Sequence, residues 1–345
     1  MAGPDVVLTV DDVTRHFPVR GQFLRRSPDV VKALDGVSFD LRKGETLGIV
    51  GESGCGKTTL ARTIVGLDTP SSGAVLFRGQ NVHTAKGAEA RTLRRRIQIV
   101  LQDPYASLNP RRTLRDILMQ PFQIHPDVIP RAKRLDRVKE LIELVGLNPD
   151  HLDRYPFQFS GGQRQRIGIA RALALDPEVI VCDEPVSALD VSIQAQVVNL
   201  FQRLQAELGL SYVFIAHDLS VVRHISDRIG VMYLGRVAEL GDRGEVYDTP
   251  AHPYTSALLS AAPIPDPTLR GTRTRRLLQG DPPSPVNPPS GCRFRTRCWL
   301  AEDVCATHEP PLARVDPDSD REVACHFPLT EPAPSATSAS REGTP

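Results

Sequence analysis

The feature that most constrains this chain is the segment Gly51-Glu-Ser-Gly-Cys-Gly-Lys57-Thr58, which matches the phosphate-binding loop pattern at every fixed position. The apolar run 47–50 before it predicts a buried strand, and residues 58–65 after it predict a helix. Glycines between a strand and a helix N-terminus let successive N–H groups curl around an anion. The sequence therefore predicts an α/β fold built around a phosphate site.

The composition is that of a globular protein with one large core or two domains. The 345 residues are 40% hydrophobic and 24% charged, with a net charge of +1. This balance does not favour nucleic acid or an anionic membrane as a partner, and we interpret the arginine-rich segment 91–96 as a solvated helix face. The chain has no apolar run of about 18 residues and no signal-peptide pattern at its N-terminus. We expect a cytoplasmic protein that reaches a membrane only through a partner.

Apolar strands alternate with helices in the first part of the chain, which predicts a largely parallel sheet. Between residues 104 and 160, apolar residues recur at helical spacing without a convincing strand, so we predict a helical insertion there. A further apolar stripe ends at Gly209 and predicts a helix packed on the sheet through Val197, Leu200, Phe201, Leu204 and Leu208. The expected strands are residues 6–10, 37–41, 46–50, 97–101, 179–183, 212–216 and 229–233.

The last quarter of the chain differs in composition from the rest. Eight prolines between residues 261 and 290 predict a loop-rich linker, and the Pro, Ser, Ala and Thr tail from residue 331 predicts disorder. Four of the six cysteines lie between these segments. We expect three regions: residues 1–262 with a helical subdomain at about 104–175, then 263–330 with the cysteines, then the tail 331–345.

Two carboxylates, Asp183 and Glu184, stand at the end of the apolar strand 179–183. Such a pair is usually part of a solvated loop, but beside a phosphate loop it has the form of a Walker B segment. On this interpretation Lys57 contacts the terminal phosphates, while Thr58 and Asp183 hold Mg²⁺. Glu184 would then polarise the attacking water.

Two further polar residues follow predicted strands. Gln102 comes after residues 97–101 and could reach the metal or the water, and His217 comes after residues 212–216, where a neutral imidazole could contact a γ-phosphate. Ligands of open α/β sheets bind at the carboxyl ends of the strands. The predicted catalytic set is Glu184, His217, Gln102 and Lys57.

A second phosphate cradle is predicted in front of the expected helix 164–174. Small residues at a helix start expose N–H donors. The segment here is Ser160-Gly-Gly-Gln163. One chain therefore carries two phosphate sites of different design.

Together these motifs resemble those of the ATP-binding subunits of ABC transporters, over roughly residues 6–330. The resemblance implies a P-loop NTPase core with an antiparallel β subdomain and a helical subdomain, binding ATP and Mg²⁺. It also implies a head-to-tail homodimer or heterodimer, with ATP between the phosphate loop of one subunit and the Ser160 to Gln163 loop of the other. The residues implied to contact nucleotide or metal are Phe17, Gly51, Glu52, Ser53, Gly54, Cys55, Gly56, Lys57, Thr58, Thr59, Gln102, Ser160, Gly161, Gly162, Gln163, Asp183 and Asp190.

Two of these residues carry particular roles by the same resemblance. Ser187-Ala-Leu-Asp190 is similar to the loop that crosses the subunit interface. Phe17 is similar to the aromatic residue that stacks on adenine, and Phe39 and Phe23 are nearby alternatives for that role.

A finer resemblance is to the oligopeptide and dipeptide importer branch. Gln102-Asp-Pro-Tyr-Ala-Ser-Leu-Asn-Pro110 resembles the stretch where coupling helices of the permease dock, and His252-Pro-Tyr-Thr-Ser-Ala-Leu-Leu-Ser260 resembles the branch's C-terminal motif. This implies a peripheral ATPase at the cytoplasmic face of the membrane that powers peptide import. Its implied partners are two permease subunits and, indirectly, an extracytoplasmic solute-binding protein.

The chain departs from this branch around the second cradle. Phe159 stands where the family usually has Leu, and Phe157-Gln158 replaces the usual His-Glu. Both changes alter packing near the cradle, but the N–H donors remain, so we expect activity to be retained.

The C-terminal cysteines Cys292, Cys298, Cys305 and Cys325 are separated by five, six and nineteen residues. Four thiolates suit a [4Fe–4S] cluster, and these spacings are longer than the two-residue knuckles of structural zinc. Some importers of this branch are similar here and carry such a cluster. Zinc and unligated, packed thiols stay open as alternatives.

Other functions fit parts of the pattern. Nickel, sugars or other solutes replace peptides in close relatives of the branch. Non-transport ATPases acting on nucleic acid or ribosomes share the fold, but they usually have two ATPase cores or long coiled-coil insertions, whereas about a hundred residues separate Gly51 from Ser160 here. A non-catalytic regulatory subunit is a further alternative, and the residues that argue against it are Lys57, Asp183, Glu184 and His217.

Overall fold

The structure is a computed structural model that describes residues 5–19, 29–103, 105–261, 278, 280–317 and 319–330. It divides into two compact units, the first made of Met1–Val13, Ser38–Leu47 and Thr58–His217, the second of Thr14–Val37, Gly48–Lys57 and Asp218–Pro345. Phe23, most of the predicted proline-rich linker and the predicted tail 331–345 lie outside the described residues.

Parallel strands form the centre of the first unit. β6 (Ile97–Val100) pairs with β7 (Val179–Asp183), and β7 pairs with β8 (Ser211–Ile215), all in parallel. Every residue of β7 and β8 is buried, which is typical of parallel strands covered on both faces. β8 also adjoins β3 (Thr46–Val50). The predicted parallel strands are confirmed, and their carboxyl ends share one edge.

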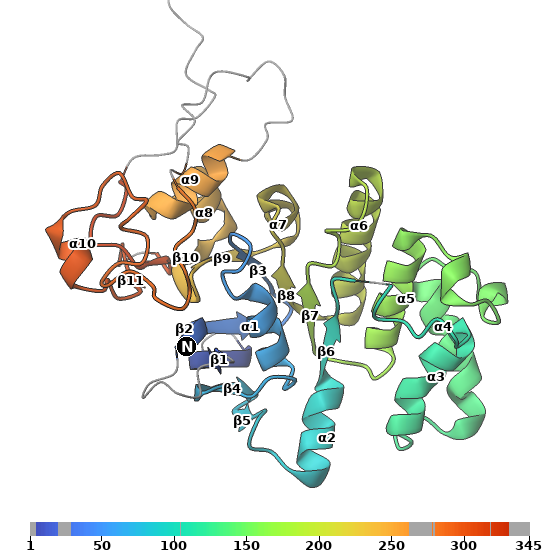
Figure 1. The fold of residues 1–345 in the computed structure, drawn as a ribbon. Helices are drawn as coiled ribbons and strands as arrows, with labels where there is room; N and C mark the ends of the chain where they lie inside the picture. Colours follow the sequence, from blue (N-terminus) through green and yellow to red (C-terminus); the bar gives the residue numbers. More distant parts are fainter. Residues whose placement is uncertain are drawn as a thin grey trace, which may run out of the picture. The chain divides into compact units, whose positions relative to one another are not determined.

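Helices α3 (Leu114–Ile124), α4 (Arg134–Leu144) and α5 (Gly161–Leu173) pack against one another (Figure 1), with short 3₁₀ turns at Arg131–Lys133, Pro149–His151 and Pro156–Gln158. No strand interrupts the described residues between 105 and 160, so the predicted helical insertion is confirmed. The remaining helices of this unit are α1 (Lys57–Ile64), α2 (Gly87–Arg96) and α6 (Val191–Leu208).

Helix α6 ends where the sequence predicted, because Gly209 adopts a left-handed φ of 66°. Its predicted apolar stripe is buried at four positions, but the expectation that Leu208 joins the core is wrong, since 48% of that residue is exposed. Leu208 is the last residue of the helix. The predicted solvated arginine face lies on α2, where Leu93 is the buried residue.

The antiparallel β subdomain has the order β2-β1-β4-β5. β1 (Val6–Pro18) and β2 (Val30–Arg42) are both longer than the expected strands. β4 (Ser72–Phe77) and β5 (Gln80–Asn81) form an antiparallel pair that the sequence pattern did not predict. Residues 72–77 begin with Ser and Gly, which weakens their strand signal.

The second unit contains the strand order β11-β12-β10-β9-β3. β9 (Arg228–Tyr233) and β10 (Arg236–Asp242) pair antiparallel, and the short strands β11 (Ala313–Arg314) and β12 (Glu322–Val323) continue from β10. The helices of this unit are α7 (Leu219–Ile225), α8 (Arg243–Asp248), α9 (Pro253–Ala261) and α10 (Asp303–Thr307). The cysteine-containing region thus adds strands to a sheet, which the sequence analysis did not predict.

The helices within the described ranges are all too short or too polar to cross a lipid bilayer.

Candidate functional site

The phosphate-loop residues 51–57 lie in the second unit as a curled segment that follows β3. Lys57 is buried, and its Nζ donates hydrogen bonds to the carbonyl oxygens of Gly51 (2.7 Å) and Glu52 (3.0 Å). Gly56 has a φ of +109°, and a Cβ there would come within 2.2 Å of the Ala33 carbonyl oxygen. Only glycine fits this turn, so the loop geometry depends on the residue that the motif requires.

Within the loop, Cys55 is buried and Ser53 and Gly54 are exposed. Burial raises the pKa of the Cys55 thiol, although the Lys57 ammonium opposes this shift. Cys55 is therefore a protonated packing residue near neutral pH, and any anion contact at this position comes from its backbone.

Two residues far along the chain fix the second residue of the loop. The Glu52 amide donates a hydrogen bond to the Tyr254 hydroxyl at 3.0 Å. The Glu52 carboxylate forms a two-pronged ion pair with the Arg297 guanidinium, at 2.8 Å and 3.1 Å. Sequence analysis missed both contacts, because nothing in the local pattern links residue 52 to residues more than two hundred positions away.

The predicted magnesium ligands come together in the first unit. The Thr58 hydroxyl, which follows Lys57 directly, lies 3.3 Å from a carboxylate oxygen of Asp183 at the end of β7. A hydroxyl and a carboxylate are the oxygen ligands that Mg²⁺ takes beside phosphates. The residues present therefore fit this metal.

Glu184 is the centre of a second polar cluster in the same unit. Gln102 Nε2 donates to Glu184 Oε2 at 2.8 Å, and His217 Nδ1 lies 3.7 Å from the same oxygen. Two residues predicted at the ends of other strands, Gln102 and His217, are thus brought to the Glu184 carboxylate. The predicted metal contact of Gln102 is not among these interactions and stays a prediction.

Glu184 also has an unusual backbone. Its φ is +45°, in the left-handed region, and its amide donates to the Ile215 carbonyl at 2.9 Å. A non-glycine residue in this region costs free energy and persists when its surroundings hold it, often at functional sites. Sequence patterns carry no signal for such strain.

The second predicted cradle forms the start of α5. Ser160 is the N-cap: its hydroxyl accepts from the Gln163 amide, and the Gln163 side chain accepts from the Ser160 amide at 3.0 Å. The helix begins at Gly161 rather than at the expected residue 164, because this capping box closes the first turn. Gly161 and Gly162 are the first two helical residues, so no carbonyl within the helix accepts a hydrogen bond from their amides.

Gly162 has a second role. A Cβ at this position would come within 2.5 Å of Ile193 Cγ2 on α6, so its lack of a side chain allows two helices of the first unit to approach. A Cβ at Gly161 would meet Leu189 at 3.5 Å, an ordinary contact.

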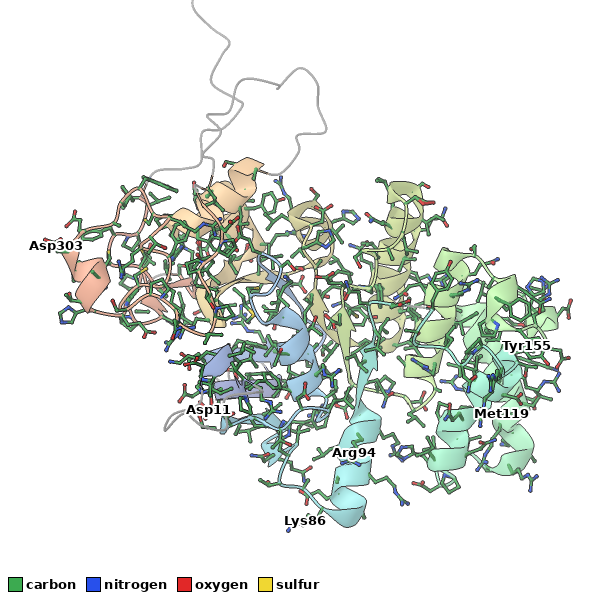
Figure 2. The ribbon with its side chains drawn as sticks, in the orientation of Figure 1. Asp11, Lys86, Arg94, Met119, Tyr155 and Asp303 are labelled. Carbon is green, nitrogen blue, oxygen red and sulfur yellow. The ribbon has the colours of Figure 1, made fainter. Side chains whose placement is uncertain are left out.

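The residues that depart from the importer branch pack in front of the cradle. Phe159 is buried and meets His151 edge to face at 6.1 Å. The Gln158 side chain accepts from the Tyr155 amide at 2.8 Å, and the exposed Phe157 ring stacks on Tyr155, which is labelled in Figure 2. The cap on α5 is intact beside these substitutions.

The other predicted nucleotide contacts have clear local settings. Phe17 is half-buried in β1, and the Arg15 guanidinium lies over its ring, 4.4 Å from the ring centre, whereas Phe39 is buried.

Asp190, in the predicted interface loop, is the N-cap of α6, but its side chain makes no cap hydrogen bond. The Ser187 hydroxyl donates to the Glu184 backbone carbonyl at 3.0 Å, which connects the predicted interface loop to the strained backbone of Glu184. The half-buried Thr59 carbonyl accepts from Thr63.

The four C-terminal cysteines are free thiols in the second unit. Burial raises the pKa of Cys292 and Cys298, and raises that of Cys325 to about 12. Within the described residues no three His, Cys, Asp or Glu side chains are arranged to hold a metal ion. The thiols lie near one another, because Cys292, Cys298 and Cys305 add to the burial that raises the pKa of Cys325. Ligation of a metal or an iron–sulfur cluster by these cysteines stays a prediction.

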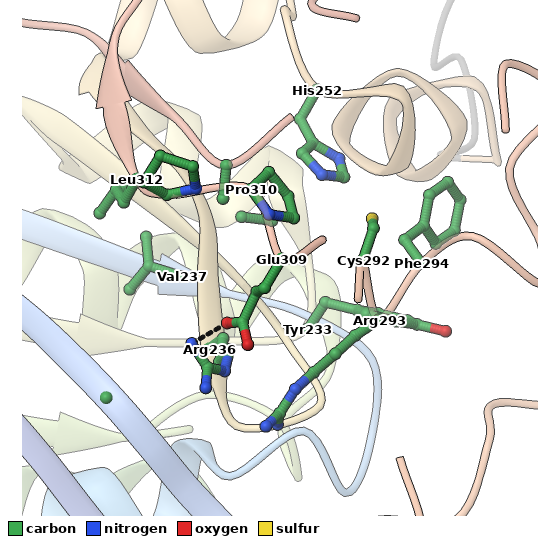
Figure 3. Close-up of a pocket in the computed structure, with 14 residues that line it drawn as sticks. Tyr233, Arg236, Val237, His252, Cys292, Arg293, Phe294, Glu309, Pro310 and Leu312 are labelled. Atoms are coloured by element: carbon green, nitrogen blue, oxygen red, sulfur yellow. Dashed lines mark ion pairs between the residues drawn. The ribbon is translucent and has the colours of Figure 1, made fainter. Parts of the chain in front are cut away.

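A cavity of about 300 Å³ opens beside Cys292 (Figure 3). Cys292, Phe294 and His252 line it, together with Arg236 and Glu309, which form an ion pair. The Arg293 guanidinium at its wall pairs with Asp35. None of the predicted nucleotide-contacting residues lines this cavity, so it is separate from the phosphate loop.

Comparison with known proteins gives the chain its family. Residues 34–187 match the ABC transporter family, and residues 238–305 match the oligopeptide/dipeptide transporter C-terminal region. The chain is 54% identical to the oligopeptide transport ATP-binding protein OppF of Escherichia coli, over 90% of this chain and 93% of that protein. It is 53% identical to the oligopeptide transport ATP-binding protein AppF of Bacillus subtilis, over 94% and 98%.

Solved structures share the fold. The dimeric post-hydrolysis state of the ATP-binding cassette MJ0796, bound to ADP and Pi, matches with a TM-score of 0.60 at 28% identity, covering 68% of this chain and 98% of that one. CbiO1 of Clostridium perfringens, part of an ABC transporter complex, matches with a TM-score of 0.59 at 28% identity, covering 70% and 91%. The chain therefore belongs to the ATP-binding subunits of ABC transporters, with the C-terminal region of the oligopeptide/dipeptide transporters.

Proposed function

We propose that this chain hydrolyses ATP to energise the import of oligopeptides or dipeptides through a partner permease. The observation that carries the catalytic part is the convergence of Gln102 and His217 on one carboxylate oxygen of Glu184. The transported class comes from the relatives, which are named as oligopeptide transport ATP-binding proteins.

In the proposed nucleotide site, the phosphate-loop amides from Gly51 to Gly56 and the Lys57 ammonium hold the terminal phosphates. Lys57 would exchange its two loop carbonyl partners for phosphate oxygens. Thr58 and Asp183 would hold Mg²⁺, which, when bound, neutralises charge that develops on the transferred phosphoryl group. Phe17 is proposed to stack on the adenine ring.

In the proposed hydrolysis step, the Glu184 carboxylate orients the attacking water and accepts its proton. The Gln102 amide holds the Glu184 oxygen in position, and His217 stabilises charge near the γ-phosphate. The strained Glu184 backbone fixes this carboxylate at the end of β7.

The proposed assembly is a head-to-tail dimer, with a copy of this chain or with a homologous second subunit. The amides of Gly161 and Gly162, which have no intrahelical partner, would meet the nucleotide held by the partner, with Asp190 crossing the interface. Because each nucleotide would then contact both subunits, ATP would stabilise the closed dimer more than the open one. Closure would pull on the bound permease, and loss of the γ-phosphate would reopen the pair.

The proposed location is the cytoplasmic face of the membrane, with residues 102–110 against two permease subunits. Co-purifying the permease with this chain and measuring phosphate release tests the proposal. Oligopeptides, presented by the solute-binding protein, are expected to raise the rate of phosphate release. A complex stimulated by nickel or sugars and not by peptides would overturn the proposed cargo.

The [4Fe–4S] cluster predicted at Cys292, Cys298, Cys305 and Cys325 stays a separate prediction, and no step above passes through it. Full-length protein purified without oxygen should then be brown, and Cys305→Ser should abolish the visible absorption. Colourless wild-type protein without bound iron would contradict the cluster.

A further inference from the structure

The C-terminal region holds the phosphate loop through one ion pair. Glu52, the second residue of the loop, receives both terminal nitrogens of Arg297 in a fork geometry, at 2.8 Å and 3.1 Å. Only 6% of the Arg297 side chain and 23% of the Glu52 side chain are exposed. A two-pronged, largely buried pair of this kind is stronger and more specific in geometry than a surface salt bridge.

The surroundings keep Arg297 in place. Its Nη1 also donates to the Tyr233 hydroxyl at 3.4 Å, and the Tyr233 ring packs against Tyr254 at 4.6 Å between centroids. Tyr254 accepts the Glu52 amide, and Phe294 packs edge to face on Tyr233 at 5.4 Å. The Glu52 backbone is therefore held by Tyr254 of α9, and its side chain by Arg297 of the cysteine-containing segment. Tyr233 of β9 contacts both Tyr254 and Arg297.

The position of Glu52 makes its charge important. A carboxylate inside a loop that binds polyphosphate repels the ligand, since like charges disfavour each other at short range. Arg297 cancels that charge on the protein side of the loop. The C-terminal segment that supplies Arg297 is flanked by Cys292 and Cys298, which the nucleotide chemistry does not use.

We propose that Arg297 is a positioning residue for nucleotide binding: by neutralising and orienting Glu52 it keeps the phosphate loop receptive to ATP, so the C-terminal region sets the affinity of the ATP site. This inference rests on the proposed nucleotide site at residues 51–58. It assigns to the C-terminal region an effect on ATP affinity and leaves the proposed roles of the hydrolytic residues in the first unit unchanged.

The test uses the full chain and compares ATP binding, by titration with mant-ATP, with hydrolysis. Arg297→Ala is expected to raise the Kd and the KM for ATP about tenfold while kcat stays within about twofold, since the change affects binding rather than chemistry. Arg297→Lys, which keeps the charge and loses the fork, is expected to stay within about threefold of the wild-type Kd.

The decisive variant removes both charges. Glu52→Gln combined with Arg297→Ala is expected to bring the Kd back to within about threefold of the wild type, because no unpaired carboxylate is left in the loop. A purely structural loss of the contact would not be reversed in this way. A wild-type Kd for Arg297→Ala, or a double variant as weak as the single one, would overturn the inference.

The controls distinguish the proposed effect of Arg297 on ATP affinity from a general effect of losing an arginine, from misfolding and from a wrong nucleotide site. Arg295→Ala removes a half-buried arginine of the same segment, bonded to the Ser290 carbonyl at 2.9 Å, and is expected to leave the Kd unchanged. Should Arg297→Ala fail to fold, Arg297→Gln carries the same expectation with a side chain that fills more of the space. Lys57→Ala should lose ATP binding: if it does not, the proposed nucleotide site is wrong, whereas a normal Arg297→Ala beside a defective Lys57→Ala contradicts this inference alone.

Discussion

At the scale of single residues, the first unit brings two polar side chains, Gln102 and His217, to one oxygen of Glu184, and this arrangement makes a direct prediction. Glu184→Gln keeps the shape and the Gln102 contact but cannot accept a proton. We expect the variant to bind ATP with near wild-type affinity and to hydrolyse it at least about a hundredfold more slowly. Phosphate release and mant-ATP titration on the same preparation measure both. Near-normal turnover would remove Glu184 from its proposed role.

Gly162 allows a second test at this scale. A methyl group there would meet Ile193 Cγ2 at 2.5 Å, and the branched isoleucine has little freedom to move aside. Gly162→Ala is expected to destabilise the protein by about 1–3 kcal/mol, the usual cost of overpacking. Denaturant unfolding measures this change.

Gly168 in the same helix is the matched control for Gly162. A Cβ at Gly168 would meet nothing within 4 Å. Gly168→Ala is therefore expected to stabilise the helix by up to about 1 kcal/mol through helix propensity. Equal effects of the two substitutions would contradict the packing role of Gly162.

At the scale of elements, the junction of β10, β12 and α9 surrounds a buried histidine. His252 Nδ1 accepts from the Tyr254 amide at 3.0 Å, and the Glu239 carboxylate accepts the His252 amide. Burial lowers the pKa of His252 to about 4, although a hydrogen bond with the Ala324 backbone opposes the shift.

This histidine predicts how stability depends on pH. In the unfolded chain its pKa is about 6.5, so below that pH the unfolded state binds a proton that the folded state excludes. Stability is therefore complete above about pH 6.5 and falls by about 2 kcal/mol by pH 5. Unfolding measurements at pH 7.5 and 5 should show this loss. His252→Gln should reduce it, and the exposed His224→Gln should leave it unchanged; an equal loss in all three proteins would contradict the assignment.

The elements also show how far sequence could predict the site. Gln102, Glu184 and His217 were predictable because each follows a buried parallel strand, and parallel strands bring their carboxyl ends to one edge. The contact of Arg297 with Glu52 joins residues 245 positions apart, and no periodicity or spacing rule reports such a pair. The left-handed backbone of Glu184 was equally hidden, since strain depends on the surrounding packing.

Some elements were predicted in type but not in extent. Helix α5 begins three residues earlier than expected, because the Ser160 and Gln163 capping box closes its first turn. The two-residue strand β12 was missed because so short a strand has a weak signal, and its pairing depends on a distant segment. The seven-residue strand β10 was missed because Glu239 and Gly241, both buried, interrupt its apolar pattern.

At the scale of the whole molecule, the account depends on a nucleotide site that is complete only between two chains. The Gly161 and Gly162 amides at the start of α5 have no intrahelical partner and suit an anion supplied from outside their own helix. The solved ATP-binding cassette MJ0796, similar to this chain, is dimeric with ADP and Pi bound. These observations support the proposed dimer with ATP bound between the two subunits.

The most direct test of this central claim is the molar mass of the Glu184→Gln chain, measured by sedimentation with Mg²⁺ and either ATP or ADP. With ATP, which the variant binds and hardly hydrolyses, the mass should double, or a one-to-one complex should form with a homologous second subunit. With ADP, or after adding Lys57→Ala, the chain should remain a monomer. A chain that stays monomeric at saturating ATP, both alone and with the second subunit, would contradict the account.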